Sequence, residues 1–276
     1  MEQLRSALTH PPANLLFEVM RNHSIGIWLA IVLAVAAPEP AAIAQAERAG
    51  LPILQTAECQ VPDTVAWSRP LLSDSPASQV ALPELIVVAL GSSSTVGVGA
   101  SSAQNGFVAQ FVRAFETRTG GRRIHVINAG VNGDTAANMR KRLHTDVLDR
   151  KPAVVIWQTG TNDALQQVPV LQFRQDLTDG IAELKSRSIN IVLVDQQNFT
   201  RASAVKDFAS YVRAVEDVAQ QENVTLLHRY RVMRYLSERR SGGIQSLLAS
   251  DRLHMNDVAH RCIGELLADG IGRLLR

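Results

Sequence analysis

The sequence predicts an α/β fold: a three-layer α/β/α sandwich around a central, mostly parallel, five-stranded sheet. Short β-branched apolar runs alternate strictly with longer amphipathic stretches. The predicted strands are residues 86–90, 124–128, 153–157, 191–195 and 224–227. Because these runs are apolar at nearly every position, we expect the sheet to be covered on both faces. Strict alternation of strand and helix implies right-handed βαβ units with parallel strands.

The helices are predicted from apolar side chains that recur at helical spacing, as Phe107, Phe111, Ala114 and Phe115 do. The predicted helices are residues 106–119, 136–150, 170–187, 204–222 and 257–275. The loops between strands and helices are short except around 165–170 and 239–250, so we expect little lid over any site at the edge of the sheet.

The composition is that of a globular protein with little net charge. The 276 residues are 46% hydrophobic and 20% charged, and the formal net charge is +2. This suits one α/β domain with extra terminal sequence, or at most two small domains. So small a charge gives no reason to expect nucleic acid as a partner. No cysteine or histidine cluster has the spacing of a metal site.

Residues 1–44 are predicted to be a secretory signal peptide. The uncharged apolar run 25–37 follows Arg21 and precedes a small-x-small cleavage site that ends at Ala44, with a second such site ending at Ala46 as the alternative. The run is shorter than the roughly 20 residues that span a bilayer, so we expect no stable span after cleavage. An uncleaved anchor or a buried helix is the alternative. A start at Met20 would give a tidier signal, and in either case we expect a secreted or periplasmic protein.

Residues 45–83 are predicted to form an irregular extension that wraps the domain or stays mobile, and residues 84–276 the domain itself. The extension is rich in Ala, Pro, Ser and Gln and has no sustained period. It contains Cys59, and the last predicted helix contains Cys262. An oxidising compartment permits one disulfide between them, and two separate buried thiols remain an equal alternative.

Small polar residues gather after the predicted strands, where open parallel sheets bind their ligands. The clusters are residues 91–95, 128–135 and 160–163, with a fourth, 251–254, before the last helix. We therefore expect these four segments to lie along one edge of the sheet and to form the site.

The four clusters contain the parts of an acyl-transfer site. Ser93 is a weak nucleophile unless a base takes its proton, and His254, oriented by Asp251 three residues earlier, can supply that base. Attack creates a negatively charged oxygen that fixed donors must meet. The backbone N–H groups of Ser93 and Gly133 and the side-chain amide of Asn162 are the candidate donors.

These clusters resemble the sequence blocks of the SGNH hydrolases, also called GDSL esterases. The matching residues are Ser93, Gly133 and Asn162, followed by Asp251 with His254. The second cluster is similar to that of lysophospholipase- and arylesterase-like members, and the resemblance covers about residues 86–275. It implies a flavodoxin-like SGNH fold and a serine esterase that forms an acyl-serine on small-molecule esters. No metal or organic cofactor is implied.

The first cluster departs from the family pattern, because Ser92 stands where the family usually has Asp. This change leaves the orientation of the serine open, and Ser92 or Ser94 is the alternative nucleophile. It is also the single feature that favours a non-catalytic binding module derived from the fold. A carbohydrate O-acetylesterase or an acyltransferase could use the same residues, and the sequence does not rank these substrates.

Other polar residues are given structural roles. Residues 91–99 lack the lysine of a P-loop and the third glycine of a dinucleotide fingerprint, so nucleotide binding is not expected. We expect His260 on a helix surface and Asp163 in a turn. Asp134 with Thr135 should cap the helix that follows them.

Overall fold

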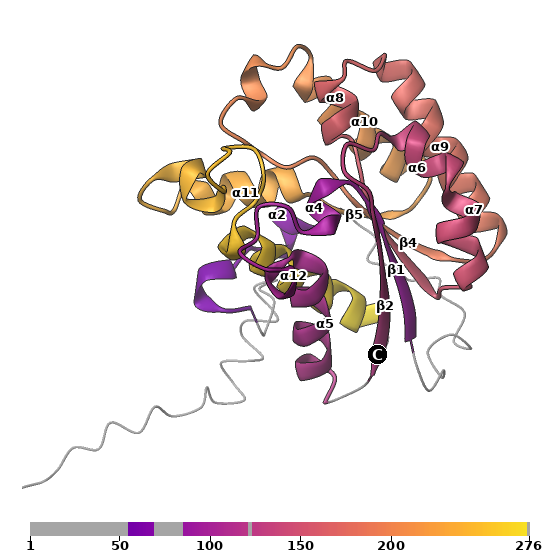
Figure 1. Cartoon of the computed structure of the whole chain (residues 1–276), viewed down its shortest axis with the longest axis horizontal. Coiled ribbons are helices and arrows are strands. Elements are labelled where there is room, and N and C mark those ends of the chain that lie inside the picture. The colour runs from indigo at the N-terminus through magenta and orange to yellow at the C-terminus, as the bar shows by residue number, and fades with distance from the viewer. Residues whose placement is uncertain (1–54, 69–84, 121–122, 275–276) are drawn as a thin grey trace, which may run out of the picture. The chain divides into compact units, whose positions relative to one another are not determined.

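The computed structural model describes residues 55–68, 85–120 and 123–274 and is built on one sheet (Figure 1). All five strands are parallel, in the order β2-β1-β3-β4-β5. The strands are β1 (Leu85–Gly91), β2 (Ile124–Gly130), β3 (Val154–Gln158), β4 (Asn190–Val194) and β5 (Thr225–Leu227). The predicted α/β fold class is confirmed, and every strand lies within two residues of its predicted bounds.

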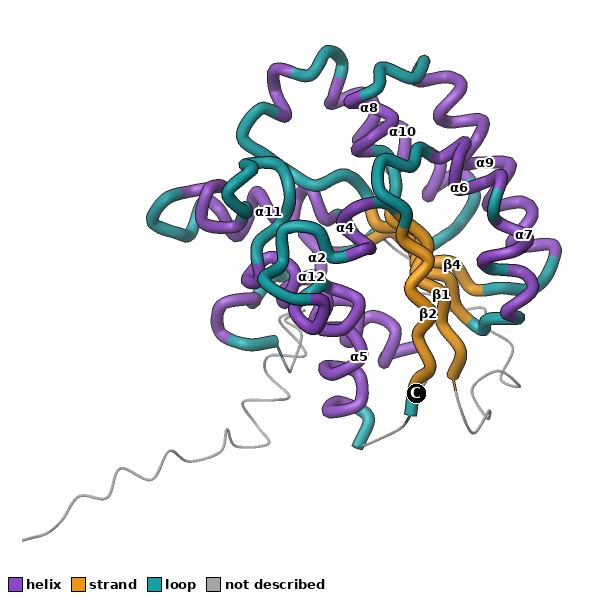
Figure 2. The backbone as a smooth tube through the Cα atoms, in the orientation of Figure 1, coloured by secondary structure: helices purple, strands orange, loops and turns teal. Residues whose placement is uncertain are grey.

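Helices cover both faces of the sheet. On one face α5 (Phe107–Arg118) packs against α12 (Asp257–Leu274). On the other face α9 (Val170–Ser186) packs against α6 (Ala136–Lys141) and α10 (Phe208–Gln221). Figure 2 shows the strands between these two groups of helices. The arrangement is the three-layer sandwich that the alternation of strands and helices predicts.

The shorter helices were not all expected. They are α2 (Asp63–Ala66), α4 (Ser93–Val96), α7 (Leu143–Asp146), α8 (Thr161–Leu165) and α11 (Arg229–Ser237). The expectation of one helix over 136–150 is wrong, because Arg142 leaves the helical conformation (φ −106°, ψ 9°) and separates α6 from α7. Helix α11 carries three arginines and was not predicted.

Packing under the sheet is close around Trp157 in β3. This side chain is fully buried, and its Nε1 donates to the sulfur of Met139 in α6 at 3.1 Å. A Cβ atom added at Gly180 in α9 would lie 2.4 Å from the indole ring. Helix α9 therefore approaches the sheet closely because a glycine faces Trp157.

The described part of the predicted extension packs on the domain. Residues 55–68 hold Cys59, which forms a disulfide with Cys262 in α12. Trp67 forms an antiparallel bridge with Leu227 at the end of β5. Of the two alternatives that the sequence leaves for the cysteines, the structure contains the disulfide.

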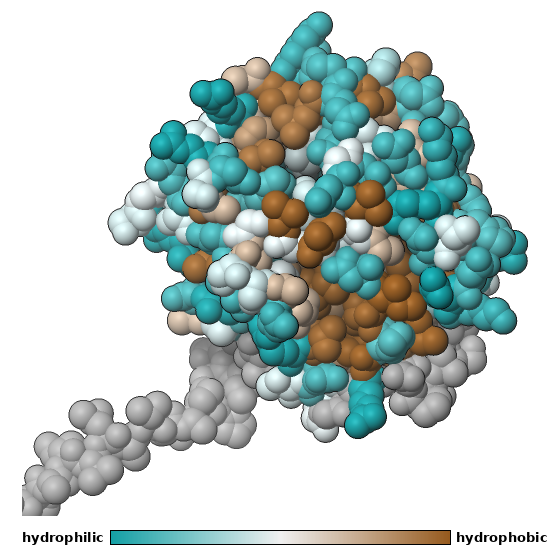
Figure 3. Space-filling model, in the orientation of Figure 1, coloured by the Kyte–Doolittle hydropathy of each residue, from teal (hydrophilic) through white to brown (hydrophobic). Residues whose placement is uncertain are grey.

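The predicted signal peptide, residues 1–44, lies outside the described residues. Within the described ranges, no helix has both the length and the apolar character that crossing a membrane requires. Figure 3 shows a largely hydrophilic surface on the face in view, with a hydrophobic area in the region where Figure 1 draws β2. β2 is an edge strand, and its Val126, Ile127 and Ala129 are only partly buried.

Candidate active site

The candidate nucleophile stands on a tight turn between β1 and α4. β1 ends at Gly91 and α4 begins at Ser93, so only Ser92 separates strand from helix. Ser92 and Ser94 are buried, and their hydroxyls donate to Gln158 and Gln197 respectively. Of the three consecutive serines, Ser93 is the one whose hydroxyl faces a histidine.

Three side chains form a continuous chain of hydrogen bonds. The Ser93 Oγ lies 2.8 Å from His254 Nε2, and His254 Nδ1 lies 2.6 Å from Asp251 Oδ2. The second carboxylate oxygen, Asp251 Oδ1, accepts the backbone N–H groups of Leu253 and His254, each at 2.9 Å. Residues 161 positions apart in the sequence thus meet at the carboxyl edge of the sheet.

The surroundings of Asp251 keep its carboxyl group ionised. Burial alone would raise its pKa, but the hydrogen bonds from the His254 ring and from two backbone N–H groups outweigh it and hold the pKa below its ordinary value. An ionised carboxylate only accepts hydrogen bonds, so the neutral His254 ring carries its proton on Nδ1. Nε2 is then free to accept the Ser93 hydroxyl proton.

The loop before α12 that holds His254, residues 248–256, is called the histidine loop and packs against a glycine turn. Gly99 has φ +93°, a conformation that side chains other than glycine rarely adopt. A Cβ atom there would lie 2.8 Å from the His254 Cβ and 2.4 Å from the carbonyl oxygen of Met255. Glycine at this position lets the segment after α4 pack closely against the backbone and Cβ atoms of His254 and Met255.

Two of the candidate oxyanion donors lie on the loop after β2, which holds Gly133, and in the first turn of α8, which holds Asn162. Gly133 has φ +80°, and no atom lies within 4 Å of where its Cβ would be, so its backbone borders open space. Asn162 Nδ2 donates to the carbonyl of Asp134 at 2.9 Å, which leaves its second N–H for another acceptor. Gln166 Nε2 donates to the carbonyl of Gly133 at 2.9 Å. These bonds join the loop after β2 to the two ends of α8.

Arg142 links the loop after β2, which holds Asp134, to the end of β1 next to the turn that holds Ser93. Its guanidinium donates to the carbonyls of Gly91 (3.0 Å) and Ala129 (2.8 Å). It also pairs with Asp134 (2.7 Å) and Asp146 (2.6 Å). Asp134 thus holds Arg142, while the predicted helix cap comes from Thr135, whose Oγ1 accepts the N–H of Asn138 at 3.4 Å. The guanidinium group of Arg142 therefore holds together the ends of β1 and β2 and the loop that follows β2.

Two glutamines at the ends of strands were missed by the sequence analysis. Gln158 Oε1 accepts the Ser92 N–H (3.0 Å), the Ser92 hydroxyl (3.1 Å) and the Thr95 hydroxyl (3.0 Å). Gln197 accepts the Ser94 hydroxyl (2.6 Å) and donates to the Leu253 carbonyl (2.8 Å). Gln158 is the last residue of β3 and Gln197 lies three residues after the end of β4. These positions could have drawn attention to them, since polar side chains at the carboxyl ends of strands face the site.

Other predicted structural residues have defined partners. Asp163 Oδ1 accepts the N–H of Ala136 at the start of α6, and burial raises the pKa of Asp163 to about 6. The expectation that His260 lies on a helix surface is wrong, because its side chain is fully buried between α5 and α12. Its Nδ1 accepts the N–H of Phe107 at 3.1 Å, and its Nε2 lies 3.2 Å from the carbonyl of Val98.

One cluster among the described residues has the groups that a metal ion could use. The ligand atoms of Asp195, Glu216 and His228 lie within 4.8 Å of one another. Burial raises the pKa of Asp195 to about 7 and lowers that of His228 to about 4, so it opposes charge on both. Arg231 lies 2.7 Å from Glu216, and the buried Arg229 donates to the Asp195 carbonyl. These two guanidinium groups already supply the positive charge that a metal would bring.

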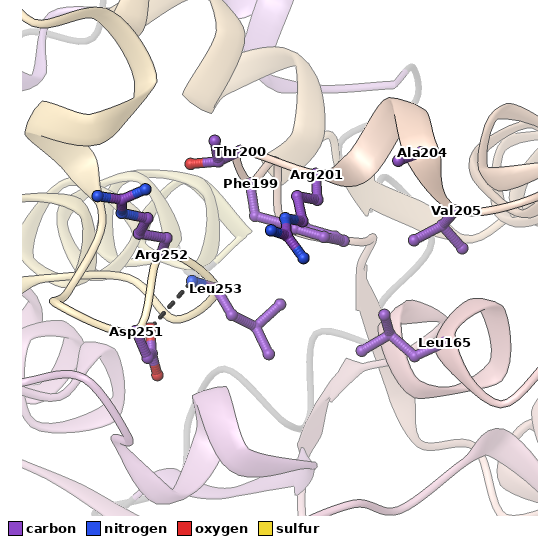
Figure 4. Close-up of a pocket in the computed structure, with 9 residues that line it drawn as sticks. All are labelled: Leu165, Phe199, Thr200, Arg201, Ala204, Val205, Asp251, Arg252 and Leu253. Atoms are coloured by element: carbon purple, nitrogen blue, oxygen red, sulfur yellow. Dashed lines mark hydrogen bonds between the residues drawn. The ribbon is translucent and has the colours of Figure 1, made fainter.

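A cavity of about 560 Å³ adjoins the Asp251 loop (Figure 4). Its walls come from α8, from the loop after β4 and from the loop before α12. The lining residues are Leu165, Phe199, Thr200, Arg201, Ala204, Val205, Asp251, Arg252 and Leu253. Asp251 belongs both to this cavity and to the hydrogen-bonded chain that reaches Ser93.

The fold and this arrangement of residues define a hydrolase of the SGNH, or GDSL-like, type, a class that acts on ester bonds. The model of the non-GDSL lipase-like family matches residues 58–276. The chain therefore belongs to the non-GDSL lipase-like family.

Two relatives are similar in sequence to parts of the chain. Esterase TesA of Pseudomonas aeruginosa is 27% identical over 176 residues, which are 64% of this chain and 81% of that protein. The uncharacterized lipoprotein YqeF of Bacillus subtilis is 33% identical over 114 residues, or 39% of this chain. That match spans 46% of YqeF, about half of its length.

Solved structures share the fold. The lipase/acylhydrolase from Enterococcus faecalis superimposes with a TM-score of 0.59 at 26% identity, over 68% of this chain and 96% of that chain. The crystal structure of TesA gives a TM-score of 0.55 at 23% identity, over 69% of this chain and 99% of that chain. The second likeness bears on the fold alone.

Proposed function

We propose that this chain is an exported serine esterase that hydrolyses small carboxylic esters through an acyl-serine intermediate. Ser93 is the nucleophile, His254 the general base and Asp251 the residue that orients the imidazole. The observation that carries the proposal is the chain of short contacts from Ser93 Oγ through His254 to Asp251. A base within hydrogen-bond reach of the hydroxyl is the geometry that activates a serine.

The first half of the reaction forms the acyl-serine. Ser93 Oγ attacks the ester carbonyl carbon while His254 Nε2 takes the hydroxyl proton, and Asp251 stabilises the imidazolium that results. The carbonyl oxygen becomes negatively charged, and the N–H groups of Ser93, Gly133 and the Asn162 amide stabilise it. When this intermediate collapses, the bond to the alcohol breaks and His254 returns the proton to the leaving oxygen.

The second half releases the acid. A water molecule gives a proton to His254 Nε2 and attacks the acyl carbon, and the same donors stabilise the second tetrahedral intermediate. The bond to Ser93 Oγ breaks, and His254 returns the proton to the serine. Each of these steps uses only the ester, water and the residues named. An alcohol in place of water would make the product a new ester, so product analysis with added alcohol separates transfer from hydrolysis.

Export is proposed from three features. Residues 1–44 form a signal peptide in this proposal, with residues 45–83 as an extension and 84–276 as the hydrolase domain. The disulfide between Cys59 and Cys262 suits an oxidising compartment. A relative, YqeF, is named as a lipoprotein. A secreted or periplasmic location agrees with all three, and fractionation of the native host with an antibody would test it.

The experiment for catalysis compares Ser93→Ala and His254→Ala with the unchanged protein on a chromogenic short-chain ester. Each variant should lose about 10⁴-fold or more in kcat, as expected when a member of such a triad is removed. Ser186→Ala and His144→Ala are the matched controls, because both residues are exposed and lie away from the site residues. Full activity in both test variants would refute the assignment.

A further inference from the structure

The cavity beside Asp251 combines an apolar wall with two cationic side chains. The apolar residues come from α8, from the segment around the short helix Ala202–Ala204 and from the histidine loop. They are Leu165, Phe199, Ala204, Val205 and Leu253. Arg201 and Arg252 are both exposed residues of the lining. In Figure 4 the guanidinium group of Arg201 points toward Leu253, whereas that of Arg252 points to the opposite side, where Arg252 also lines a second, smaller pocket. The cavity shares Asp251 with the proposed active site, and Leu253, the residue before His254, forms part of its wall.

The two arginines lack anionic partners within the described part of the chain. No ion pair or side-chain hydrogen bond involves Arg201 or Arg252 there, whereas Arg140, Arg142 and Arg174 each pair with an aspartate. An unpaired cation that lines a cavity attracts an anionic ligand. The planar guanidinium group also matches the two oxygens of a carboxylate or phosphate.

The histidine loop itself places Arg252 on this cavity. Arg252 has φ +60°, in the left-handed region that a residue with a side chain adopts at some cost in energy. Its N–H donates to the Ala249 carbonyl at 3.0 Å, and Asp251 Oδ1 accepts the next two N–H groups, those of Leu253 and His254. The turn that aims Asp251 at His254 therefore also sets the position of Arg252.

Asp251 is the one acidic residue that lines the cavity, and both of its carboxylate oxygens already accept hydrogen bonds. One oxygen meets the His254 ring and the other accepts two N–H groups. A ligand anion in the cavity consequently faces the guanidinium group of Arg201, with Arg252 at the rim, while the oxygens of the Asp251 carboxylate accept hydrogen bonds from its own loop.

We propose that this cavity selects esters that carry a second, anionic group, a carboxylate or phosphate, joined to the scissile ester by a short apolar segment. The apolar segment packs on Leu253 and Leu165, the anion binds the guanidinium group of Arg201, and Arg252 adds positive charge at the rim. A volume of about 560 Å³ is that of a small-molecule pocket. The inference rests on the proposed esterase function, because the reacting ester must sit at Ser93.

The kinetic test uses pairs of esters that differ in charge and little in shape. The first pair is the 4-nitrophenyl half-ester of adipate and its methyl-capped form, with the charge on the acyl side. The second is 4-acetoxybenzoate and its methyl ester, with the charge on the alcohol side. In at least one pair the anionic member should have a three- to tenfold higher kcat/KM, as for a charged hydrogen bond at a partly exposed site.

The variants turn this preference into a test of the arginines. Arg201→Met and Arg252→Met should each reduce the anionic-to-neutral ratio toward one, and Arg201→Glu should invert it. Arg187→Met is the matched control, because Arg187 is exposed and lies just before β4 at the opposite edge of the sheet. Replacing the terminal carboxylate of the first substrate by a phosphonate distinguishes the two anions. A ratio of one in both pairs for the unchanged protein would overturn the proposal.

A binding measurement separates this inference from the esterase proposal. In the Ser93→Ala background, saturation-transfer NMR should detect adipate monomethyl ester, and the signal should fall when Arg201 is also changed to Met. Binding that depends on Arg201, together with no ester cleavage by the unchanged protein, would refute the esterase and keep the anion site. Cleavage with no dependence on either arginine would refute the anion site alone.

Discussion

Replacing Gln158 should disable the site although Gln158 is not a reacting group. Its Oε1 accepts hydrogen bonds from the Ser92 N–H, the Ser92 hydroxyl and the Thr95 hydroxyl, all at 3.0–3.1 Å and all buried. Gln158→Met keeps the length of the side chain and removes the acceptor. Each buried donor left without a partner costs about 1–3 kcal/mol, so the turn that holds Ser93 would lose about 3 kcal/mol or more.

This cost falls on the turn that presents the nucleophile. The unpaired Ser92 and Thr95 donors would move toward other acceptors, and this movement would displace Ser93. A shift of about 1 Å in a reacting group can cost about 100-fold in rate. We therefore expect kcat of Gln158→Met to fall by about two orders of magnitude while KM changes little. Gln158→Glu keeps an acceptor oxygen in place and should recover part of the rate.

The assay combines steady-state hydrolysis of a chromogenic ester with the rate of fluorophosphonate labelling at Ser93. A urea titration of each variant shows whether the protein is folded under assay conditions. Gln220→Met, on the exposed surface of α10, is the matched control. If Gln158→Met were folded and its kcat lay within threefold of the unchanged protein, Gln158 would not position Ser93 and the reasoning would be wrong.

Four further outcomes are expected. Asn162→Ala should lower kcat about 10²- to 10³-fold in steady-state kinetics, and an unchanged kcat would remove it from the oxyanion site. Changing Cys59 and Cys262 to Ser removes a cross-link between residues 203 apart and should cost about 2–5 kcal/mol in a urea titration, so an unshifted midpoint would contradict it. Burial lowers the pKa of His260 to about 4, below the unfolded value of about 6.5, so the unfolded chain binds the extra proton and stability falls as the pH drops through this interval. His260→Asn should flatten that part of the stability curve, and equal slopes in both proteins would argue against this. Gly264→Ala puts a Cβ 2.5 Å from a side chain of α5 and should cost about 1–3 kcal/mol in thermal unfolding, whereas a neutral effect would mean that α5 and α12 separate easily.

The strands and the candidate triad could be predicted because their signals are local. A buried parallel strand is a short apolar run, and each run here became a strand. Ser93 follows a predicted strand, and Asp251 and His254 precede the last predicted helix. Because ligands bind at the carboxyl edge of such a sheet, these three residues are expected to lie together. The structure brings these three within hydrogen-bond distance.

The supporting residues could not be predicted because their roles depend on distant partners. Gln158 meets Ser92 across two neighbouring strands, which is a contact of β1 with β3 that no local pattern encodes. His260 looks like a surface residue in sequence, but α12 also packs on α5, and Phe107 supplies the N–H that lets a polar ring be buried. Arg142 follows the last residue of α6, and its side chain donates to two carbonyls at the ends of β1 and β2. The spacing of apolar residues along a helix cannot predict such a contact.

The disulfide between Cys59 and Cys262 has a consequence for damage to the chain. It encloses Ser93 and His254 in one covalent ring, since both residues lie between its ends in the sequence. A protease that cuts the ring once, for instance in the exposed turn after α11, yields two pieces that stay joined and keep their hydrogen bonds. Such a nicked protein would run as one band on a non-reducing gel, split into two after reduction, and retain activity until the thiols were freed.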